Sequence, residues 1–208
     1  MMTKLDIIKN YLDEMFPNPK CELNYNKDYE LLISTVLSAQ TTDKKVNQAT
    51  EVLYKKYNNL EALANADLED IKTIIRPIGT YNKKSVFVKE IAKYLLDNCD
   101  GKVPSEREKL ESIPGVGRKT ANLILSELFN YPAIVVDTHV SRVSKRLGIA
   151  DVNDDVSVIE KKLMDSYDKS LWCRLHLQLV LFGRYHCKAI KPECDHCKLK
   201  DICKKDYL

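Results

Sequence analysis

Residues 110–122 read Leu-Glu-Ser-Ile-Pro-Gly-Val-Gly-Arg-Lys-Thr-Ala-Asn, and this stretch decides the fold. A helix should end at Pro114, because proline lacks an amide hydrogen and clashes with the preceding helical turn. Gly115 and Gly117 then permit a tight turn in which no side chain covers the backbone N–H groups. A second helix begins near Arg118, and its first turn adds N–H groups without helical partners. The stretch therefore predicts a helix–hairpin–helix that binds a phosphate group.

A hairpin of this kind contacts the backbone of DNA and does not read base sequence. The expected DNA-binding residues of the turn are Gly115, Val116, Gly117 and Arg118. An ordinary turn between helices is the alternative, although such a turn needs only one glycine. The net charge of +3 and the pI of about 8.3 permit nucleic-acid binding without establishing it.

Lys119 is the residue that would turn DNA binding into chemistry. It falls in the first turn of the second helix, where the helix dipole disfavours a positive charge. A neutral amine is a nucleophile that can attack a sugar C1′ and form a Schiff base. From its position alone, Lys119 could equally be a phosphate contact.

Asp137 follows a short apolar run, Ala133–Val136, which we interpret as an extended connection. It is well placed to cap the helix expected at 138–147, and this structural role is a common one for aspartate. A carboxylate that faces Lys119 could also accept the lysine proton and stabilise positive charge on the sugar. Both roles are compatible with one residue.

The rest of the chain predicts an all-α protein. Only 6 glycines and 7 prolines occur in 208 residues, and apolar residues recur with helical period almost throughout. Residues 28–40 are apolar nearly all round and should form a buried helix. Helices are expected at 4–16, 28–40, 43–57, 60–64, 68–76 (capped by Asp67), 82–97, from Ser105 to Pro114, from Arg118 onward, and at 138–147, 155–167 and 169–186, the last with Leu171, Leu175, Leu179 and Phe182 on one stripe.

Four cysteines near the C-terminus, Cys187, Cys194, Cys197 and Cys203, have the spacing C-x6-C-x2-C-x5-C. Thiolates so close in sequence can converge on one metal centre, and they suit either zinc or an iron–sulfur cluster. The spacing alone does not choose between these. The other three cysteines (Cys21, Cys99 and Cys173) are expected to be small buried apolar residues.

The N-terminal segment carries acidic residues and has no apolar core, so no signal peptide is expected. No stretch approaches the length of about 18 apolar residues that crosses a membrane. These features predict a cytoplasmic protein with no membrane partner, in which cysteines are thiols or metal ligands. A monomer is the simplest expectation.

Taken together, these residues resemble the endonuclease III family of DNA glycosylase/AP lyases. The resemblance extends over most of the chain, through five motifs: Leu37–Asp43 (LSAQTTD), Ile113–Asn122, Val136–His139 (VDTH), Gly183–Tyr185 (GRY) and the cysteine spacing.

The resemblance implies a six-helix domain at 21–131 and a cluster domain that combines 1–20 with 132–208. It implies a [4Fe–4S] cluster on Cys187, Cys194, Cys197 and Cys203. It also implies the removal of oxidised pyrimidines from double-stranded DNA, followed by β-elimination at the AP site. Gln40 and His139 would then be DNA-binding residues, and Ser38 and Glu111 would border the base pocket.

One position departs from the family. A glycosylase of this kind flips its target nucleotide out of the duplex, and a side chain must fill the gap. Where the family commonly has leucine, this chain has Thr80, followed by Tyr81. We therefore hypothesise that Tyr81 or Gln40 fills part of the gap, and we include Thr80 and Tyr81 among the DNA-binding residues.

Three rival functions remain on the residues alone. A monofunctional glycosylase for mismatched or damaged bases would release a base without cutting the strand. A non-catalytic DNA-binding protein or a zinc module would use the cysteines only to brace a loop. The presence of Lys119, and a chain that continues only five residues past Cys203, favour the bifunctional enzyme over its mismatch-specific relatives.

Overall fold

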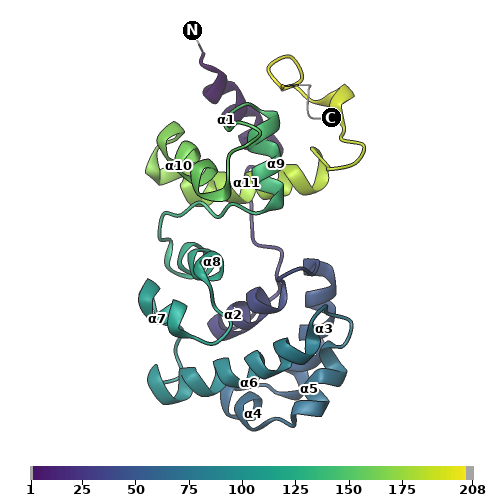
Figure 1. Ribbon diagram of the computed structural model, residues 1–208, viewed down its shortest axis with the longest axis vertical. Coiled ribbons are helices and arrows are strands. Elements are labelled where there is room, and N and C mark those ends of the chain that lie inside the picture. The colour runs from purple at the N-terminus through teal and green to yellow at the C-terminus, as the bar shows by residue number, and fades with distance from the viewer. Residues whose placement is uncertain (1, 205–208) are drawn as a thin grey trace. The chain divides into compact units, whose positions relative to one another are not determined.

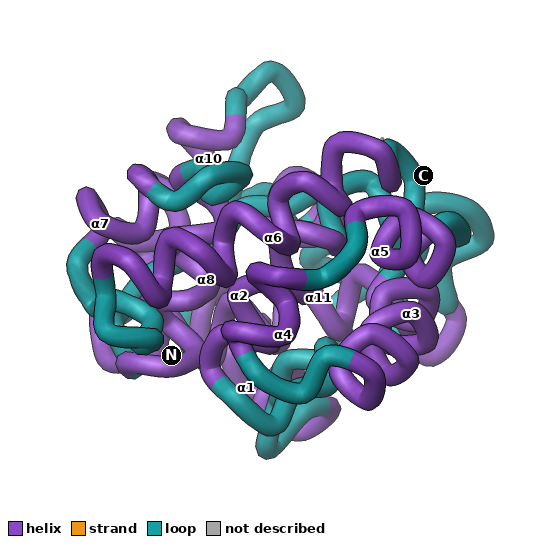
Figure 2. Tube along the Cα trace, turned by 90° about the horizontal axis from the view of Figure 1, so that it is seen from below, coloured by secondary structure: helices purple, strands orange, loops and turns teal. Residues whose placement is uncertain are grey.

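The computed structural model describes residues 2–204, and all regular structure in that range is helical (Figures 1 and 2). The prediction of an all-α fold is therefore confirmed. Residues 133–136 have no regular secondary structure and connect α8 to α9. No helix within the described range is both long and apolar enough to span a bilayer.

Eleven α-helices and two 3-10 turns are described, and they follow the predicted order. They are α1 (Lys4–Met15), α2 (Asp28–Leu37), α3 (Asp43–Lys56), α4 (Leu60–Asn65), α5 (Leu68–Ile75), α6 (Tyr81–Asn98), α7 (Arg107–Ser112), α8 (Arg118–Phe129), α9 (Thr138–Arg146), α10 (Val156–Ser166), η1 (Lys169–Leu171), α11 (Trp172–Tyr185) and η2 (Cys194–His196).

The chain forms two compact units. Glu22–Phe129 is a continuous unit that contains α2 to α8. The second unit combines Met1–Cys21 with Asn130–Leu208, so its first helix and its last helices come from opposite ends of the chain.

The continuous unit is built around α2, whose residues from Tyr29 to Leu37 are all buried. This confirms the prediction of a helix that is apolar on every side. Helices α3, α6 and α8 pack against α2, and α6 also packs on α4 and α5. Helix α2 ends at Leu37, three residues before the predicted end at Gln40, because Gln40 adopts a left-handed backbone with φ of 56°.

In the discontinuous unit, α1 and α9 pack against α11. The predicted stripe of α11 is confirmed for Leu175, Leu179 and Phe182, which are buried in this core. The single helix expected at 169–186 is instead two elements. Asp168 accepts a hydrogen bond from the Ser170 amide and holds a separate 3-10 turn that ends at Leu171.

The expectation that three isolated cysteines are buried is wrong, because all three are partly exposed. Cys21 lies in a loop, and the other two lie at the ends of helices. Cys21 precedes the continuous unit, Cys99 is the C-cap of α6, and Cys173 is in the first turn of α11. The Cys173 thiol donates to the Tyr131 carbonyl at 3.3 Å.

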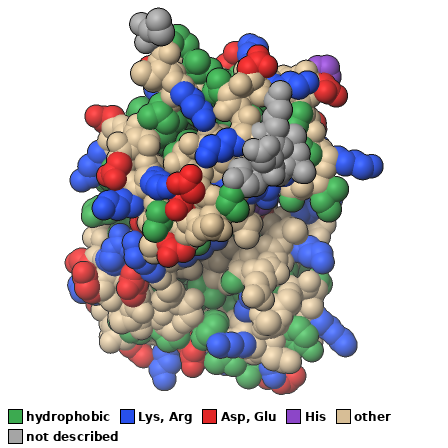
Figure 3. Space-filling model, turned by 45° about the horizontal axis from the view of Figure 1, so that its top comes forward, with side chains coloured by type: hydrophobic (Ala, Val, Ile, Leu, Met, Phe, Trp, Pro, Cys, Tyr) green, Lys and Arg blue, Asp and Glu red, His purple; other side chains and the backbone are tan. Residues whose placement is uncertain are grey.

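Basic and acidic side chains are interspersed on the face shown in Figure 3. This distribution fits a chain with 33 basic and 30 acidic residues. Binding to a charged partner must therefore depend on particular side chains and backbone groups, and not on net charge alone.

Candidate active site and cysteine centre

The predicted hairpin connects α7 to α8 in the continuous unit. Gly115 has φ of 81°, a conformation that favours glycine. A Cβ at this position would also lie 2.8 Å from the Phe87 ring of α6, so the ring packs directly on the turn. Around Gly117 there is open space, with no atom within 4 Å of a Cβ placed there. Both glycines are exposed.

Val116 contributes differently from the glycines that flank it. Its side chain is buried, and its amide donates to the Ile113 carbonyl at 3.0 Å. Val116 therefore anchors the hairpin to the core of the unit. Any contact that the turn makes with a phosphate is left to its exposed neighbours, including the side chain of Arg118.

Lys119 lies in the first turn of α8, as the sequence predicted, and its side chain is exposed. The helix that carries it is tied to α7 by Arg107, whose guanidinium donates to the Asn122 side chain and lies 3.8 Å from the Glu111 carboxylate. Glu111 is itself exposed. These contacts hold together the two helices that flank the turn. They therefore fix the backbone position from which the Lys119 side chain extends.

Two further predicted residues lie in the loop after α2. Ser38 is half-buried and donates to the Thr35 carbonyl at 2.8 Å, and the Thr41 amide donates to the Ser38 carbonyl at 3.0 Å. The resulting tight turn carries Gln40 exposed at its tip.

The loop before α6 lies beside that turn. A Cβ on Gly79 would meet the Gln40 carbonyl and the Thr41 hydroxyl at 3.9 Å each. Thr80 is exposed in a left-handed conformation, with φ of 57°, and its hydroxyl donates to the Gly79 carbonyl at 2.7 Å. Tyr81, the first residue of α6, is half-buried. Gln40 and Thr80 are therefore neighbours within one unit.

Asp137 is the N-cap of α9 in the discontinuous unit, as predicted. Its Oδ1 accepts the Val140 amide at 2.8 Å. His139, in the first turn of the same helix, lies with its Nδ1 3.2 Å from an Arg142 guanidinium nitrogen. A Cβ on Gly183 would come within 2.9 Å of the His139 Cβ, so α9 and α11 approach closely here.

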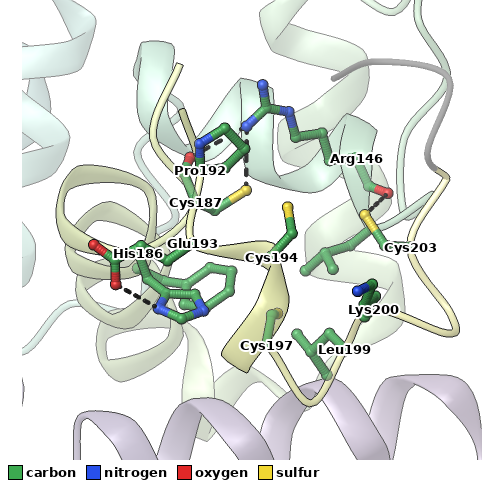
Figure 4. A pocket seen from close by; sticks show the side chains of 12 residues that line it. Arg146, His186, Cys187, Pro192, Glu193, Cys194, Cys197, Leu199, Lys200 and Cys203 are labelled. Carbon is green, nitrogen blue, oxygen red and sulfur yellow. Dashed lines mark hydrogen bonds and ion pairs between the residues drawn. The ribbon is translucent and has the colours of Figure 1, made fainter. Parts of the chain in front are cut away.

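The four C-terminal cysteines line one pocket of about 120 Å³ (Figure 4). Cys187 follows α11, Cys194 begins η2, Cys197 is the C-cap of η2, and Cys203 lies further along the loop. Burial raises the pKa of the Cys197 and Cys203 thiols. Among the described residues, no three metal-binding side chains converge on a point where a single ion could be held.

Arg146 of α9 fastens the loop that carries these cysteines. Its side chain is only 4% exposed. The guanidinium donates to the Lys188 carbonyl at 2.7 Å and lies 3.4 Å from the Cys187 sulfur. Its own carbonyl accepts the Cys203 thiol at 3.2 Å and the Lys204 amide at 2.8 Å. One arginine thus connects the first and last of the four cysteines.

Several residues of these sites were not predicted from the sequence: Phe87, Arg107 and Arg146. Two more are His186, which lines the cysteine pocket, and Lys84, whose Nζ donates to the Leu37 and Ala39 carbonyls. The strongest sequence signal belongs to Lys84, which interrupts an apolar stripe of α6 that continues with Val88, Ile91 and Leu95. A lysine at such a position has to bury its ammonium among hydrogen-bond acceptors.

Residues 33–169 match the family model described as HhH-GPD superfamily base excision DNA repair protein. Endonuclease III of Bacillus subtilis strain 168 is 41% identical over 98% of this chain and 93% of its own length. Endonuclease III of Haemophilus influenzae is 42% identical over 97% of this chain and 95% of its own.

A solved structure of a trapped endonuclease III–DNA covalent intermediate, an estranged-adenine complex, superposes with a TM-score of 0.90. It is 44% identical and the match covers 98% of this chain and 97% of that one. With the hairpin, the cysteine loop and these matches in agreement along the whole chain, the protein belongs to the endonuclease III family within the HhH-GPD superfamily of base excision DNA repair proteins.

Proposed function

We propose that this chain is a bifunctional DNA N-glycosylase and AP lyase that removes oxidised pyrimidines from double-stranded DNA. The observation that carries the proposal is an exposed lysine in the first helical turn after a two-glycine hairpin. The relative that was trapped covalently on DNA supports a lyase, because a monofunctional glycosylase forms no such intermediate. Since the proposed substrate is DNA, we expect the protein in the cytoplasm, associated with the nucleoid if its source is bacterial or archaeal.

Lys119 would be the nucleophile. Its neutral Nζ attacks C1′ of the flipped nucleotide, the N-glycosidic bond breaks, and the base leaves with the bonding electron pair. Loss of the amine proton and opening of the sugar give a Schiff base between Nζ and C1′. Removal of a C2′ proton then expels the 3′ phosphate by β-elimination, and water hydrolyses the Schiff base to free the lysine.

Asp137 would act on the same centre. Its Oδ1 is occupied by the Val140 amide, which fixes the orientation of the carboxylate. The carboxylate would stabilise positive charge that develops on the sugar and accept the proton that Lys119 loses. The N-cap role and the chemical role therefore use one geometry.

The exposed groups of the hairpin would hold the DNA backbone. Gly115, Gly117 and Arg118 supply backbone amides and a guanidinium for a phosphate, while Val116 supports the turn from below. Gln40, Thr80, Tyr81 and His139 would complete the DNA contacts, and Ser38 and Glu111 would border the base pocket.

Cys187, Cys194, Cys197 and Cys203 would hold a [4Fe–4S] cluster. A zinc site closes four sulfurs around one ion at about 2.3 Å, whereas each cysteine of a cubane cluster binds a different iron atom. All four thiols line one pocket of about 120 Å³, so the donor set suits a four-thiolate centre, and the family resemblance favours the cluster. The cluster would supply bonds to four thiolates and so stabilise the fold of this loop.

His186 adds to this fit. Its Nδ1 lies 3.4 Å from the Glu193 carboxylate, while its Nε2 is buried and has no hydrogen-bond partner among the described residues. The ring lines the same pocket (Figure 4). A buried nitrogen without a partner is costly, and a bound cluster with sulfide acceptors would satisfy it.

Borohydride trapping on DNA that contains thymine glycol or an AP site tests the chemistry. The wild-type protein should form a covalent adduct and nick the strand. Lys119→Ala should form none while still binding the same duplex. Lys109→Ala, on α7, is the matched control and should trap at the wild-type rate, since its exposed ammonium pairs with Glu106.

Base release without an adduct or a nick would support the monofunctional alternative and overturn the lyase. DNA binding without any chemistry would overturn both. A brown protein with an absorption band at about 400 nm is expected for the iron–sulfur cluster, and colourless protein that contains zinc would contradict it.

A further inference from the structure

Lys84 has an unusual environment for a lysine that is not in the catalytic machinery. Its side chain is only 4% exposed, in the first turn of α6. Its Nζ donates to the Ala39 carbonyl at 2.6 Å and the Leu37 carbonyl at 2.8 Å, and lies 3.3 Å from the Thr41 hydroxyl. All three acceptors belong to the end of α2 and the loop that follows it.

These contacts cap the C-terminus of α2 with a side chain from α6. The last carbonyls of α2 have no partners within the helix, and its C-terminus attracts positive charge. Lys84 meets both requirements at once. Because the acceptors lie on both sides of Ser38, the ammonium also fixes the path of the turn that carries Gln40.

The turn needs such a support because its backbone is strained. Gln40 is in the left-handed region at φ of 56°, which a residue with a side chain adopts only when its surroundings hold it there. Thr80 has the same conformation at φ of 57°, four residues before Lys84. The amide of Lys84 itself donates to the Thr80 carbonyl at 3.1 Å.

Lys84 therefore contacts both loops. Its ammonium binds the loop after α2, and its backbone amide binds the loop before α6. The Gly79 position lies against Gln40 and Thr41, so the two loops touch where the lysine joins them. Any displacement of the ammonium would release Gln40 from the position it holds beside Thr80.

We propose that Lys84 is a positioning residue that holds Gln40 and Thr80 together as a two-part plug for the gap left by a flipped nucleotide. This inference rests on the proposed function, since only an enzyme that flips nucleotides leaves a gap. It explains how a chain with the small Thr80 where its family commonly has leucine still fills that gap. Two small contributions from adjacent strained loops replace one bulky side chain.

The test separates gap filling from chemistry by the choice of DNA. A single strand with an AP site has no duplex base stack in which a flipped nucleotide leaves a gap, whereas a duplex has one. Lys84→Met removes the donor and keeps the apolar stem. It should slow borohydride trapping on the duplex about tenfold and leave trapping on the single strand within twofold of wild type. Lys83→Met, at the exposed neighbouring lysine, should change neither rate.

A binding readout keeps the inference independent of the lyase. Fluorescence of 2-aminopurine placed opposite a tetrahydrofuran AP-site analogue reports how the gap is filled. Wild type and Lys83→Met should give the same signal, and Lys84→Met a weaker one. If wild type forms no adduct but this difference persists, the proposed function fails and the positioning role stands.

Thr41→Val covers the case in which Lys84→Met does not fold. It removes one of the three acceptors and keeps the shape of the side chain, and it should lower the duplex-to-single-strand ratio of trapping rates two- to threefold. An unchanged ratio and an unchanged 2-aminopurine signal in the folded variant, or in both variants if both fold, would overturn the inference.

Discussion

The hairpin at Pro114–Lys119 and the loop at Cys187–Lys204 are both tight, exposed segments, yet different forces hold them. The hairpin is seated on buried apolar residues, with Ile113 and Val116 in the core and Phe87 against the turn. In the loop, Leu199 is the one buried residue. Its shape depends on Arg146 and on whatever its four cysteines bind. The hairpin is thus stabilised by its own apolar packing, whereas the loop depends on Arg146 and on the group that its cysteines bind.

Removal of the cysteine ligands should have the largest effect. Cys197→Ser takes away one of the four thiolates, so the absorption at about 400 nm should disappear and the loop should become sensitive to protease. Helices of the continuous unit should persist, as measured by hydrogen exchange. Cys173→Ser is the control and should leave the absorption intact. A Cys197→Ser protein with a protected loop would remove the distinction between the two segments.

Arg146 should come next. Arg146→Met removes a buried guanidinium that donates to the Lys188 carbonyl and should destabilise the protein by about 3 kcal/mol in urea unfolding. Lys145→Met, its neighbour on α9, should change stability by less than about 0.5 kcal/mol. Equal effects of the two substitutions would show that the arginine does not hold the loop.

The two hairpin glycines should differ sharply. Gly115→Ala forces a Cβ against Phe87 at a positive φ and should cost about 2 kcal/mol of stability. Gly117→Ala meets open space and should cost less than about 0.5 kcal/mol. Phe87→Leu should relieve part of the Gly115→Ala penalty in a double-mutant cycle. Additive energies would argue that packing does not shape the hairpin.

The smallest effect on stability is expected at Asp137. Asp137→Ala removes the N-cap and should cost about 1 kcal/mol, while Asp137→Asn keeps an acceptor for the Val140 amide and should cost only a few tenths. Both should lower the rate of borohydride trapping at least tenfold, since both remove the carboxylate charge. Asp137→Asn with wild-type trapping would reduce this residue to a helix cap.

Local sequence was sufficient to predict most of the helices and the hairpin. Periodicity located the buried α2, and the proline with its two glycines located the turn, because both are set by residues close together in the chain. Lys119 and the N-cap Asp137 followed from the same local signals. These features depend on backbone rules that act over a few residues.

The features that were missed depend on residues far apart in sequence. Lys84 reaches carbonyls more than forty positions earlier, and Arg146 reaches the loop more than forty positions later. The left-handed Gln40 ended α2 early, although no glycine marks that site. Tertiary contacts decide such positions, and no local pattern encodes them.

The discontinuous unit has a consequence for biosynthesis. Helix α1 leaves the ribosome first, but its packing partner α11 comes near the end of the chain. The continuous unit can fold while translation proceeds, since domains generally fold as units in order of synthesis. Helix α1 must wait, with its apolar face uncovered, until α11 has been made. A released chain truncated after residue 129 should therefore expose α1 to chaperones while its hairpin is already formed.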